Sequence, residues 1–465
     1  MLDMVATRPE TSKKPTERTN FSKSDALRRR VHDVIPGGCH TLAKGDDQFP
    51  ELAPGFIVRG KGSHVWDLDG NEYIEYGMGC RAVSLGHAFE PILDAVRNEL
   101  PMGTNFCRPA KLEVDCAEEL LSVLPFAEMC KFAKNGSDAT SAAIKLARAH
   151  TDRELIAICQ DHPFFSVDDW FIGTTAISGG IPESTRQKTL TFRYNDPESL
   201  QHLMDAYPNR IAAVILEPAK YSDPQDNFLH KVKEICVANG SLFILDEMIT
   251  GFRWDIGGAQ TVYDIEPDLS TFGKALANGF SLSALTGKRK FLECGGIYHD
   301  KQRVFLMSTT NGAETHSLAA AIATIDFYKN NPVTEVLESQ GEKLKSQLNA
   351  LIHSRQLEDH VSVEGIRSNL VFVTRDENRQ PSQSFRCLLM QELIRRGVIG
   401  PSLVTSYSHS DDDIEQTVCA FREALTVYRT ALNDGIETCL IGRPSQMVYQ
   451  NYNRPEFQNF PEHLV

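Results

Sequence analysis

Two short segments, AAVILEP at 212–218 and SLFILDE at 241–247, are almost continuously apolar, and a carboxylate follows each apolar run. A strand with one wet face alternates apolar and polar residues, whereas a strand covered on both faces is apolar throughout. The two runs therefore favour parallel strands at 211–216 and 242–245. The other predicted strands fall at 155–159, 269–272 and 304–307, and the helices at 91–100, 112–124 and 138–150. This alternation is typical of an α/β domain with a mostly parallel sheet.

The length of 465 residues exceeds what one simple hydrophobic core organises, so more than one domain is expected. The run HVWDLDGNEYIEY at 64–76 predicts a hairpin that turns at Asp69-Gly70. We predict a disordered N-terminal segment at 1–24 and an extended tail at 436–465. Between them we predict a large domain at 89–330 and a small domain formed by residues 25–88 and 331–435.

The formal net charge of −14 disfavours two classes of partner, because an acidic surface repels nucleic-acid phosphates and anionic lipid. Eleven cysteines occur without a CxxC pair or zinc spacing, which favours reduced thiols and predicts no metal site. No segment reaches the roughly 18 apolar residues of a membrane span, and the start of the chain lacks the apolar run of a signal peptide. We therefore expect a cytoplasmic protein without nucleic acid or membrane as a partner.

The segment NGSDA at 135–139 lies between a predicted strand and a predicted helix. Gly136 and Ser137 would offer free N–H groups, a hydroxyl and the positive end of the helix dipole, which is how proteins bind phosphate. The alternative is that Ser137 or Asp138 only caps the helix.

Two further residues follow buried strands. Asp246 lies where open α/β sheets bind ligands, and its carboxylate could pair with a protonated ring nitrogen; the alternatives are a metal ligand or a plain strand-end charge. Lys274, in TFGKALANG, has little reason to be there for packing. A partly desolvated lysine has a lowered pKa and can form a Schiff base with a carbonyl, whereas the ordinary alternative is a surface lysine.

A phosphate-binding turn, an acidic ring partner and a Schiff-base lysine are the groups that pyridoxal phosphate requires. With these residues in this order, the chain resembles the class III (subgroup II) aminotransferases, and within them it is similar to glutamate-1-semialdehyde 2,1-aminomutase. The resemblance covers roughly residues 25–430, in order. The supporting motifs are PGG at 36–38, WDLDGNEYIEY at 66–76, LGHA at 85–88, ILEPA at 215–219, DEMITGFR at 246–253 and PDLSTFGKALANG at 267–279.

The resemblance implies a fold-type-I enzyme that is a homodimer with its active sites at the interface. It implies that Lys274 holds pyridoxal phosphate as a Schiff base and moves protons, and that Asp246 keeps the pyridine nitrogen protonated. The remaining cofactor contacts that it implies are Gly136 and Ser137 at the phosphate, Met248 on the ring face, and Thr309 or Thr310 reaching the phosphate of the other subunit.

The sequence departs from the aminomutase pattern near the ring. In CQDHPFF at 159–165, His162 matches, but Asp161 stands where a ring-stacking tyrosine is expected, so Phe164 or Phe165 must supply the aromatic face.

It departs again where the aminomutase holds its substrate's carboxylate. His40 and Lys44 replace a serine and an arginine, and lysine lacks the planar fork of arginine. Arg81 is an additional cation, with a surface ion pair as its alternative role. Together with Glu217 of the ILEPA motif, these are the candidate substrate contacts.

We therefore expect transfer of an amino group from an amino-acid donor, with glutamate as the expected donor, to a carbonyl-bearing small metabolite. The first alternative is intramolecular transfer of the aminomutase type. A decarboxylase or racemase on the same fold, and a binding protein that keeps the fold without catalysis, are further alternatives.

Overall fold

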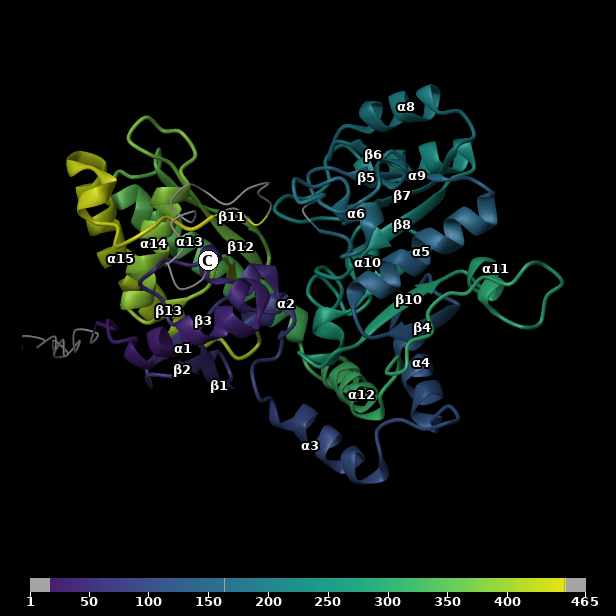
Figure 1. Ribbon diagram of the computed structural model, residues 1–465, viewed down its shortest axis with the longest axis horizontal. Helices are drawn as coiled ribbons and strands as arrows, with labels where there is room; N and C mark the ends of the chain where they lie inside the picture. Colours follow the sequence, from purple (N-terminus) through teal and green to yellow (C-terminus); the bar gives the residue numbers. More distant parts are fainter. Residues whose placement is uncertain (1–16, 163, 447, 449–465) are drawn as a thin grey trace, which may run out of the picture.

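The computed structural model describes residues 17–162, 164–446 and 448, and these form two lobes (Figure 1). One lobe contains the large sheet and the helices around it. The other combines the N-terminal hairpin region with the C-terminal third of the described chain, so segments far apart in sequence lie together there. Of the predicted tail at 436–465, residues 447 and 449–465 lie outside the described residues, as do the first sixteen residues of the chain.

The large lobe is built on a seven-stranded sheet in the order β4-β10-β9-β8-β7-β5-β6. Only β10 runs antiparallel to its neighbours, which confirms the predicted mostly parallel sheet. The strands are β4 (Met129–Ala133), β5 (Leu155–Cys159), β6 (Thr189–Phe192), β7 (Ile211–Leu216), β8 (Leu242–Asp246), β9 (Leu269–Phe272) and β10 (Ser283–Gly287).

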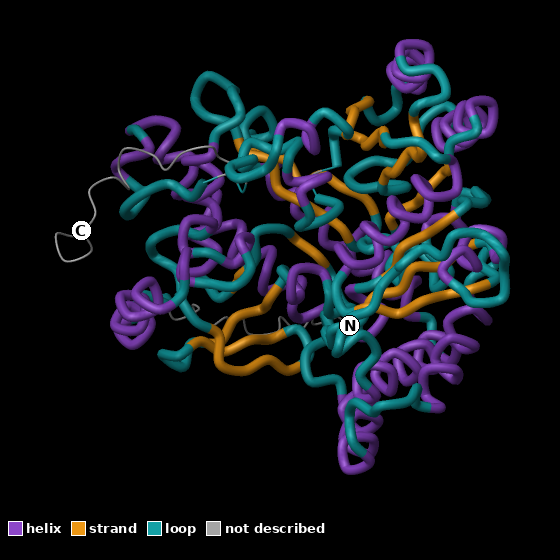
Figure 2. Tube along the Cα trace, turned by 45° about the vertical axis from the view of Figure 1, so that its right-hand side comes forward, coloured by secondary structure: helices purple, strands orange, loops and turns teal. Residues whose placement is uncertain are grey.

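Both faces of this sheet are covered, which explains the continuous apolar runs (Figure 2). In β7, Ala213 and Ile215 pack with α5 on one face, while Val214 and Leu216 pack with α8 and α9 on the other. The predicted segment 304–307 pairs with no described strand and is an irregular connection. Its apolar residues Val304, Leu306 and Met307 pack against the core without entering the sheet, so their hydrophobicity reflects burial alone.

The smaller lobe contains two small sheets, in the orders β1-β2-β3-β13 and β11-β12-β14. The predicted hairpin is confirmed, with Val65 opposite Tyr73 in antiparallel register. The strands are β1 (Ile57–Lys61), β2 (His64–Asp67), β3 (Glu72–Glu75), β11 (Val361–Ile366), β12 (Asn369–Thr374), β13 (Val398–Ile399) and β14 (Leu403–Val404). One apolar cluster joins Ile74 and Tyr76 to residues between Leu344 and Ala431, which supports the proposed division into domains.

Among the described residues, ten helices of at least ten residues surround the sheets. They are α1 (Ser22–Val34), α3 (Glu90–Glu99), α4 (Lys111–Val123), α5 (Gly136–Thr151), α8 (Pro197–Ala206), α9 (Phe228–Asn239), α12 (Thr315–Asn330), α13 (Val333–Ser354), α14 (Gln383–Arg395) and α15 (Asp411–Asp434). The shorter ones are α2 (Met78–Arg81), α6 (Asp169–Ile172), α7 (Glu183–Arg186), α10 (Ala259–Val262) and α11 (Arg289–Leu292). Single 3-10 turns are η1 (Pro36–Gly38), η2 (Leu42–Lys44), η3 (Asp46–Gln48), η4 (Leu100–Met102), η5 (Lys274–Ala277), η6 (Glu293–Gly295) and η7 (Ile436–Thr438). Within the described part of the chain, no helix is both long and apolar enough to cross a bilayer.

Candidate active site

Four neighbouring parallel strands, β9, β8, β7 and β5, end at one edge of the large sheet. Lys274 follows β9, Asp246 is the last residue of β8, Glu217 follows β7 directly, and His162 comes three residues after β5. Because the carboxyl ends of parallel strands meet at the same edge, residues far apart in sequence converge there, at the position where open α/β sheets bind ligands.

Asp246 is 3% exposed and is held in place by two hydrogen bonds. The backbone N–H of Met248 and the hydroxyl of Thr271 both donate to its Oδ1, each at 3.0 Å. No described residue donates to Oδ2, so one carboxylate oxygen is available for a ligand. Burial, reinforced by the nearby Glu217 carboxyl, raises the pKa of Asp246 to about 7.

Lys274 is not a surface lysine, because its side chain is largely enclosed. In addition, no described acid lies within ion-pair distance of its amine. Burial lowers its pKa, and the carboxyl groups of Asp246 and Glu217 oppose that effect without overcoming it. Its backbone φ is +46°, in the left-handed region that is strained for a residue with a side chain. A strained backbone and a partly desolvated amine are expected of a nucleophilic lysine.

The side chain of Met248 lies between two glycine-containing loops. A Cβ atom added at Gly136 would be 3.0 Å from its sulfur, and one added at Gly273, next to Lys274, would be 2.7 Å from it. The loop before α5 and the loop before Lys274 therefore both approach Met248 closely, and only glycine permits this. The structure thus brings three of the sequence motifs together around one methionine.

At the start of α5, the helix cap and the candidate phosphate site are provided by different residues. Asp138 performs the capping, since its Oδ2 accepts the N–H of Asn135 at 2.9 Å. The hydroxyl oxygen of Ser137 instead accepts the N–H of Val167 at 3.0 Å, which leaves its hydrogen free to donate. Gly136 and Ser137 open this 16-residue helix, so their N–H groups point along its positive end.

His162 is buried and neutral. Its Nδ1 accepts the backbone N–H of Glu217 at 3.0 Å, so its hydrogen is on Nε2, and burial lowers its pKa to about 3. Asp161, which occupies the expected tyrosine position, accepts the N–H of Tyr194 at 2.7 Å. Of the two candidate aromatic residues, Phe165 is in the core at 2% exposure, whereas Phe164 is 44% exposed. Phe164 is therefore the one with a face free for a ligand.

Arg81 forms no ion pair with a described residue, and its charge acts on the candidate site. Its Nε donates to Oδ1 of Asn369 at 2.8 Å, and its charge acts on both Glu217 and Lys274. Glu217 is 3% exposed, its Oε2 has no hydrogen-bond partner among the described residues, and burial raises its pKa.

Two residues that the sequence did not suggest complete this side of the site. Lys220 is 7% exposed and lies three residues beyond Glu217, and burial lowers its pKa to about 8. The side-chain amide of Asn369 donates a hydrogen bond to the backbone carbonyl of Lys220 at 2.9 Å. A buried lysine just past an apolar strand is the same signal that identified Lys274, so Lys220 was detectable from sequence. Asn369 was not.

Four predicted residues lie elsewhere in the chain. His40 and Lys44 are exposed in the turns after α1, and neither is among the charges that act on Lys274. Thr309 and Thr310 are exposed, and their carbonyl groups accept hydrogen bonds from Gly312 and Asn105. A role for these four in the site of the same chain gains no support from their positions.

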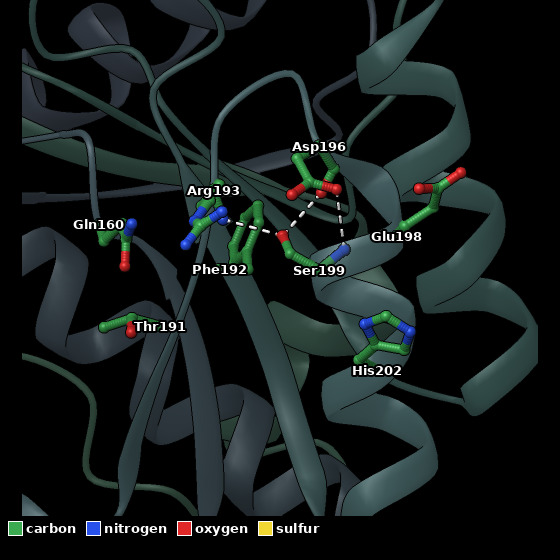
Figure 3. A pocket seen from close by; sticks show the side chains of 8 residues that line it. All are labelled: Gln160, Thr191, Phe192, Arg193, Asp196, Glu198, Ser199 and His202. Atoms are coloured by element: carbon green, nitrogen blue, oxygen red, sulfur yellow. Dashed lines mark hydrogen bonds between the residues drawn. The ribbon is translucent and has the colours of Figure 1, made fainter.

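A hollow of about 490 Å³ lies at the end of β6, but it contains neither Lys274 nor Asp246 (Figure 3). Its polar groups bind one another. The N–H of Ser199 donates to the side chain of Asp196 at 3.0 Å, and the N–H of Arg193 donates to the Ser199 hydroxyl at 3.0 Å. These bonds cap the start of α8, so the hollow is a consequence of how that helix begins.

Residues 47–425 match the model of the aminotransferase class-III family. The chain therefore belongs to this family and is an enzyme of that class, as the sequence predicted. Class III enzymes use pyridoxal phosphate, which is the predicted cofactor.

Among its relatives is a glutamate-1-semialdehyde 2,1-aminomutase from Francisella philomiragia, 30% identical over 86% of this chain and 97% of that protein. Two solved structures share the fold. The FumI protein of Sphingopyxis sp. MTA144, in its PLP internal aldimine form, is 28% identical with a TM-score of 0.82 and covers 91% of this chain and 99% of that one. An omega-transaminase from Sphaerobacter thermophilus is 25% identical with a TM-score of 0.78 and covers 87% and 98%.

Proposed function

We propose that this chain is an aminotransferase that moves an amino group from an amino-acid donor, glutamate, to a carbonyl-bearing small metabolite. The observation that supports this most directly is the position of Lys274, an enclosed amine without an ion-pair partner among the described residues, one strand away from Asp246. Bound pyridoxal phosphate would supply an electron sink that stabilises the charge left when a substrate carbon loses its proton.

The residues present fit this cofactor. Oδ2 of Asp246 has no donor among the described residues and would hold the ring nitrogen in its protonated form. Gly136 and Ser137 would bind the phosphate with their N–H groups and the free hydroxyl hydrogen. Met248 would pack against the ring, with Phe164 or the neutral His162 near it.

Lys274 would act at two stages. Its amine would hold the cofactor through a covalent bond and, when free, would take a proton from the substrate carbon that bears the nitrogen and return it to the carbon on the other side of that nitrogen. Because burial lowers the pKa of this amine, its neutral form, which can accept a proton, is favoured more than in an exposed lysine.

The assembly and location that we propose follow from the family resemblance. A homodimer would bring Thr309 or Thr310 of each chain to the phosphate of the other, which is compatible with the exposure of both residues. We propose a cytoplasmic location.

The second candidate is an aminomutase, in which both halves of the transfer occur on one substrate. A relative of that name at 30% identity favours it. Against it stand His40 and Lys44, which replace the aminomutase's carboxylate-binding residues, and the additional cation Arg81, whose charge acts on Glu217. Product analysis separates the two, because a transaminase releases the keto acid of a separate donor.

The first test is an absorbance spectrum of the purified protein with pyridoxal phosphate, before and after L-glutamate, beside Lys274→Ala. We expect a band near the visible edge that glutamate converts to the pyridoxamine form, and we expect Lys274→Ala to lack the lysine-linked band. A wild-type protein that stays colourless with added cofactor would overturn the proposal.

A further inference from the structure

After α15 the chain runs back over the smaller lobe (Figure 1). Gly435, with a φ of +97°, follows α15, and the turn η7 leads into the segment CLIGRPSQ at 439–446. The last two residues of this segment, Ser445 and Gln446, are 0% and 7% exposed. We refer to residues 439–446 as the strap. The match to the aminotransferase class-III family ends at residue 425, so the strap lies outside the matched part of the chain.

One edge of the strap is fastened to α14 by two side-chain amides that lie about two helical turns apart. The Gln391 amide donates to the carbonyl of Cys439 at 3.0 Å and accepts the N–H of Ile441 at 2.8 Å. The Gln383 amide donates to the Ser445 hydroxyl at 3.1 Å. The strap is therefore bound to this helix near both of its ends.

The other edge of the strap contacts η3 and the residues that follow it. The N–H of Gln446 donates to the carbonyl of Asp47 at 2.7 Å. Arg443 makes two contacts, from Nη2 to the carbonyl of Asp46 at 2.7 Å and from its backbone N–H to the Glu51 carboxylate at 3.2 Å. These three bonds join residues nearly 400 positions apart in the sequence.

The strap is the hydrogen-bonded connection between these turns and α14. Among the described residues, no hydrogen bond runs directly from residues 39–51 to α14. The bonds within 39–51 join close neighbours in sequence, so they shape each turn without placing it on the lobe. The other bonds that leave this segment lead to α1, where Arg28 and His32 bind the Asp46 carboxylate.

We propose that the strap is a conformational clamp that holds the turns at 39–51 against α14, and that these turns open readily without it. Segments near a chain end are poorly ordered unless they are tied down, and exposed turns with few nonlocal contacts open locally at low cost. The turns carry His40 and Lys44, so the strap also positions these two candidate substrate contacts. Only that last part of the inference rests on the proposed function.

The test is hydrogen–deuterium exchange of the full-length, cofactor-loaded protein, followed in peptides from 39–51 and from α14. Gln391→Leu removes the fastening on α14, at a residue that makes no described hydrogen bond to the turns. Gly442→Ala acts at the other edge, because the φ of Gly442 is +71° and an added Cβ would overlap the Glu51 carboxylate. Gly180→Ala is the matched control, since its φ is +83° and nothing lies within 4 Å of its added Cβ.

We expect both strap variants to speed exchange in 39–51 roughly 10-fold, the factor that follows from losing one or two hydrogen bonds that oppose a local opening. Exchange within α14 and the cofactor absorbance should stay at their wild-type values. KM for glutamate should rise roughly 3- to 10-fold with kcat unchanged, because the turns are displaced and Lys274 is not. Gly180→Ala should match the wild type in exchange at 39–51 and in KM.

Wild-type exchange at 39–51 in both strap variants would overturn the inference. If Gln391→Leu also speeds exchange along α14, Gly442→Ala decides the question, because it changes no residue of that helix. Equal acceleration of the turns and α14 in both variants would overturn the inference too, since the turns would not open on their own.

The two parts of the inference are separated by the kinetics. Faster exchange at 39–51 with an unchanged KM would refute the positioning of His40 and Lys44 and leave the clamp. A protein that never takes up pyridoxal phosphate would refute the proposed function, whereas its exchange rates would still decide whether the strap holds the turns.

Discussion

Arg253 donates a hydrogen bond from Nη2 to the backbone carbonyl of Arg81 at 2.7 Å. Arg253 is completely buried, and its Nε and Nη1 have no partner among the described residues. Burial lowers the pKa of this guanidinium to about 10. A buried arginine with so few partners destabilises the fold. Its contact with the backbone of Arg81 therefore indicates that it positions Arg81.

Replacing Arg253 should therefore affect substrate binding more than chemistry. We expect Arg253→Met to raise KM for glutamate about 10-fold with little change in kcat, because Arg81 loses the contact that holds its backbone. Arg253→Lys should restore part of the affinity. Arg148→Met is the control, since Arg148 also donates to a backbone carbonyl, that of Glu154, far from the site. The positioning role would be contradicted if Arg253→Met and Arg253→Lys both lowered kcat by the same factor by which they raised KM.

Asp246→Asn should slow the reaction with glutamate by roughly 10²- to 10³-fold, because a neutral amide cannot keep the ring nitrogen protonated. The amide still accepts from Met248 and Thr271, so the fold and cofactor uptake should be retained. Rapid-mixing absorbance measurements of the glutamate half-reaction provide the rate. A variant that reacts as fast as the wild type would remove Asp246 from the mechanism.

The raised pKa of Asp246 also predicts how stability depends on pH. Its folded-state pKa of about 7 lies above the ordinary value of an aspartate, so the folded protein holds this proton more tightly than the unfolded chain. Its contribution is fully present below about pH 4 and is lost as pH rises through 7, with an upper limit of roughly 4 kcal/mol.

This dependence can be isolated by comparing melting temperatures of cofactor-free wild type and Asp246→Asn between pH 4.5 and 8. Groups that do not interact with Asp246 titrate equally in both proteins, so the difference reports Asp246 together with Glu217 and Lys274, which interact with it. We expect the wild type to lose stability relative to the variant as pH rises, and bound pyridoxal phosphate to abolish the loss. A difference that stays constant across this range would show that the carboxyl group is ionised throughout.

Much of the large lobe was predictable from sequence, because strands covered on both faces leave a strong apolar signal. The strands at 155–159, 211–216 and 269–272 were predicted with the observed bounds, and β8 extends one residue beyond its prediction to include Asp246. The antiparallel β10 was not predicted, and 304–307 was wrongly predicted as a strand. Hydrophobicity reports burial and does not report which backbone groups find a partner.

Site residues at the end of a buried strand, such as Lys274 and Asp246, were predictable from sequence. Contacts between residues of the two lobes were not predictable. The bond from Asn369 to the carbonyl of Lys220 joins residues 149 positions apart, and although Lys220 follows an apolar strand, no local pattern marks Asn369 as its partner. The role proposed for Thr309 or Thr310 depends on a second subunit, and it stays a prediction, as do the substrate contacts proposed for His40 and Lys44.

The close approach of Gly273 to Met248 gives a prediction that separates packing from backbone strain. The φ of Gly273 is 179°, which any residue adopts, so Gly273→Ala is opposed only by contact with the Met248 sulfur 2.7 Å away and with Leu282 and Ser283 at 3.4 and 3.5 Å. Overpacking of this kind should destabilise the protein by roughly 1–3 kcal/mol and weaken cofactor binding, since it displaces the loop that carries Lys274.

Met248→Ala removes the clashing sulfur, so the double variant should be more stable than the sum of the two single changes predicts, by roughly 0.5–3 kcal/mol. Thermal or denaturant unfolding of the four proteins measures this coupling. Gly179→Ala is the matched control, because nothing lies within 4 Å of its added Cβ and it should be nearly neutral. If the effects of the two changes on stability were simply additive, Met248 would not couple the two loops. The packing that holds Lys274 near Gly136 would then have to come from Leu282 and Ser283.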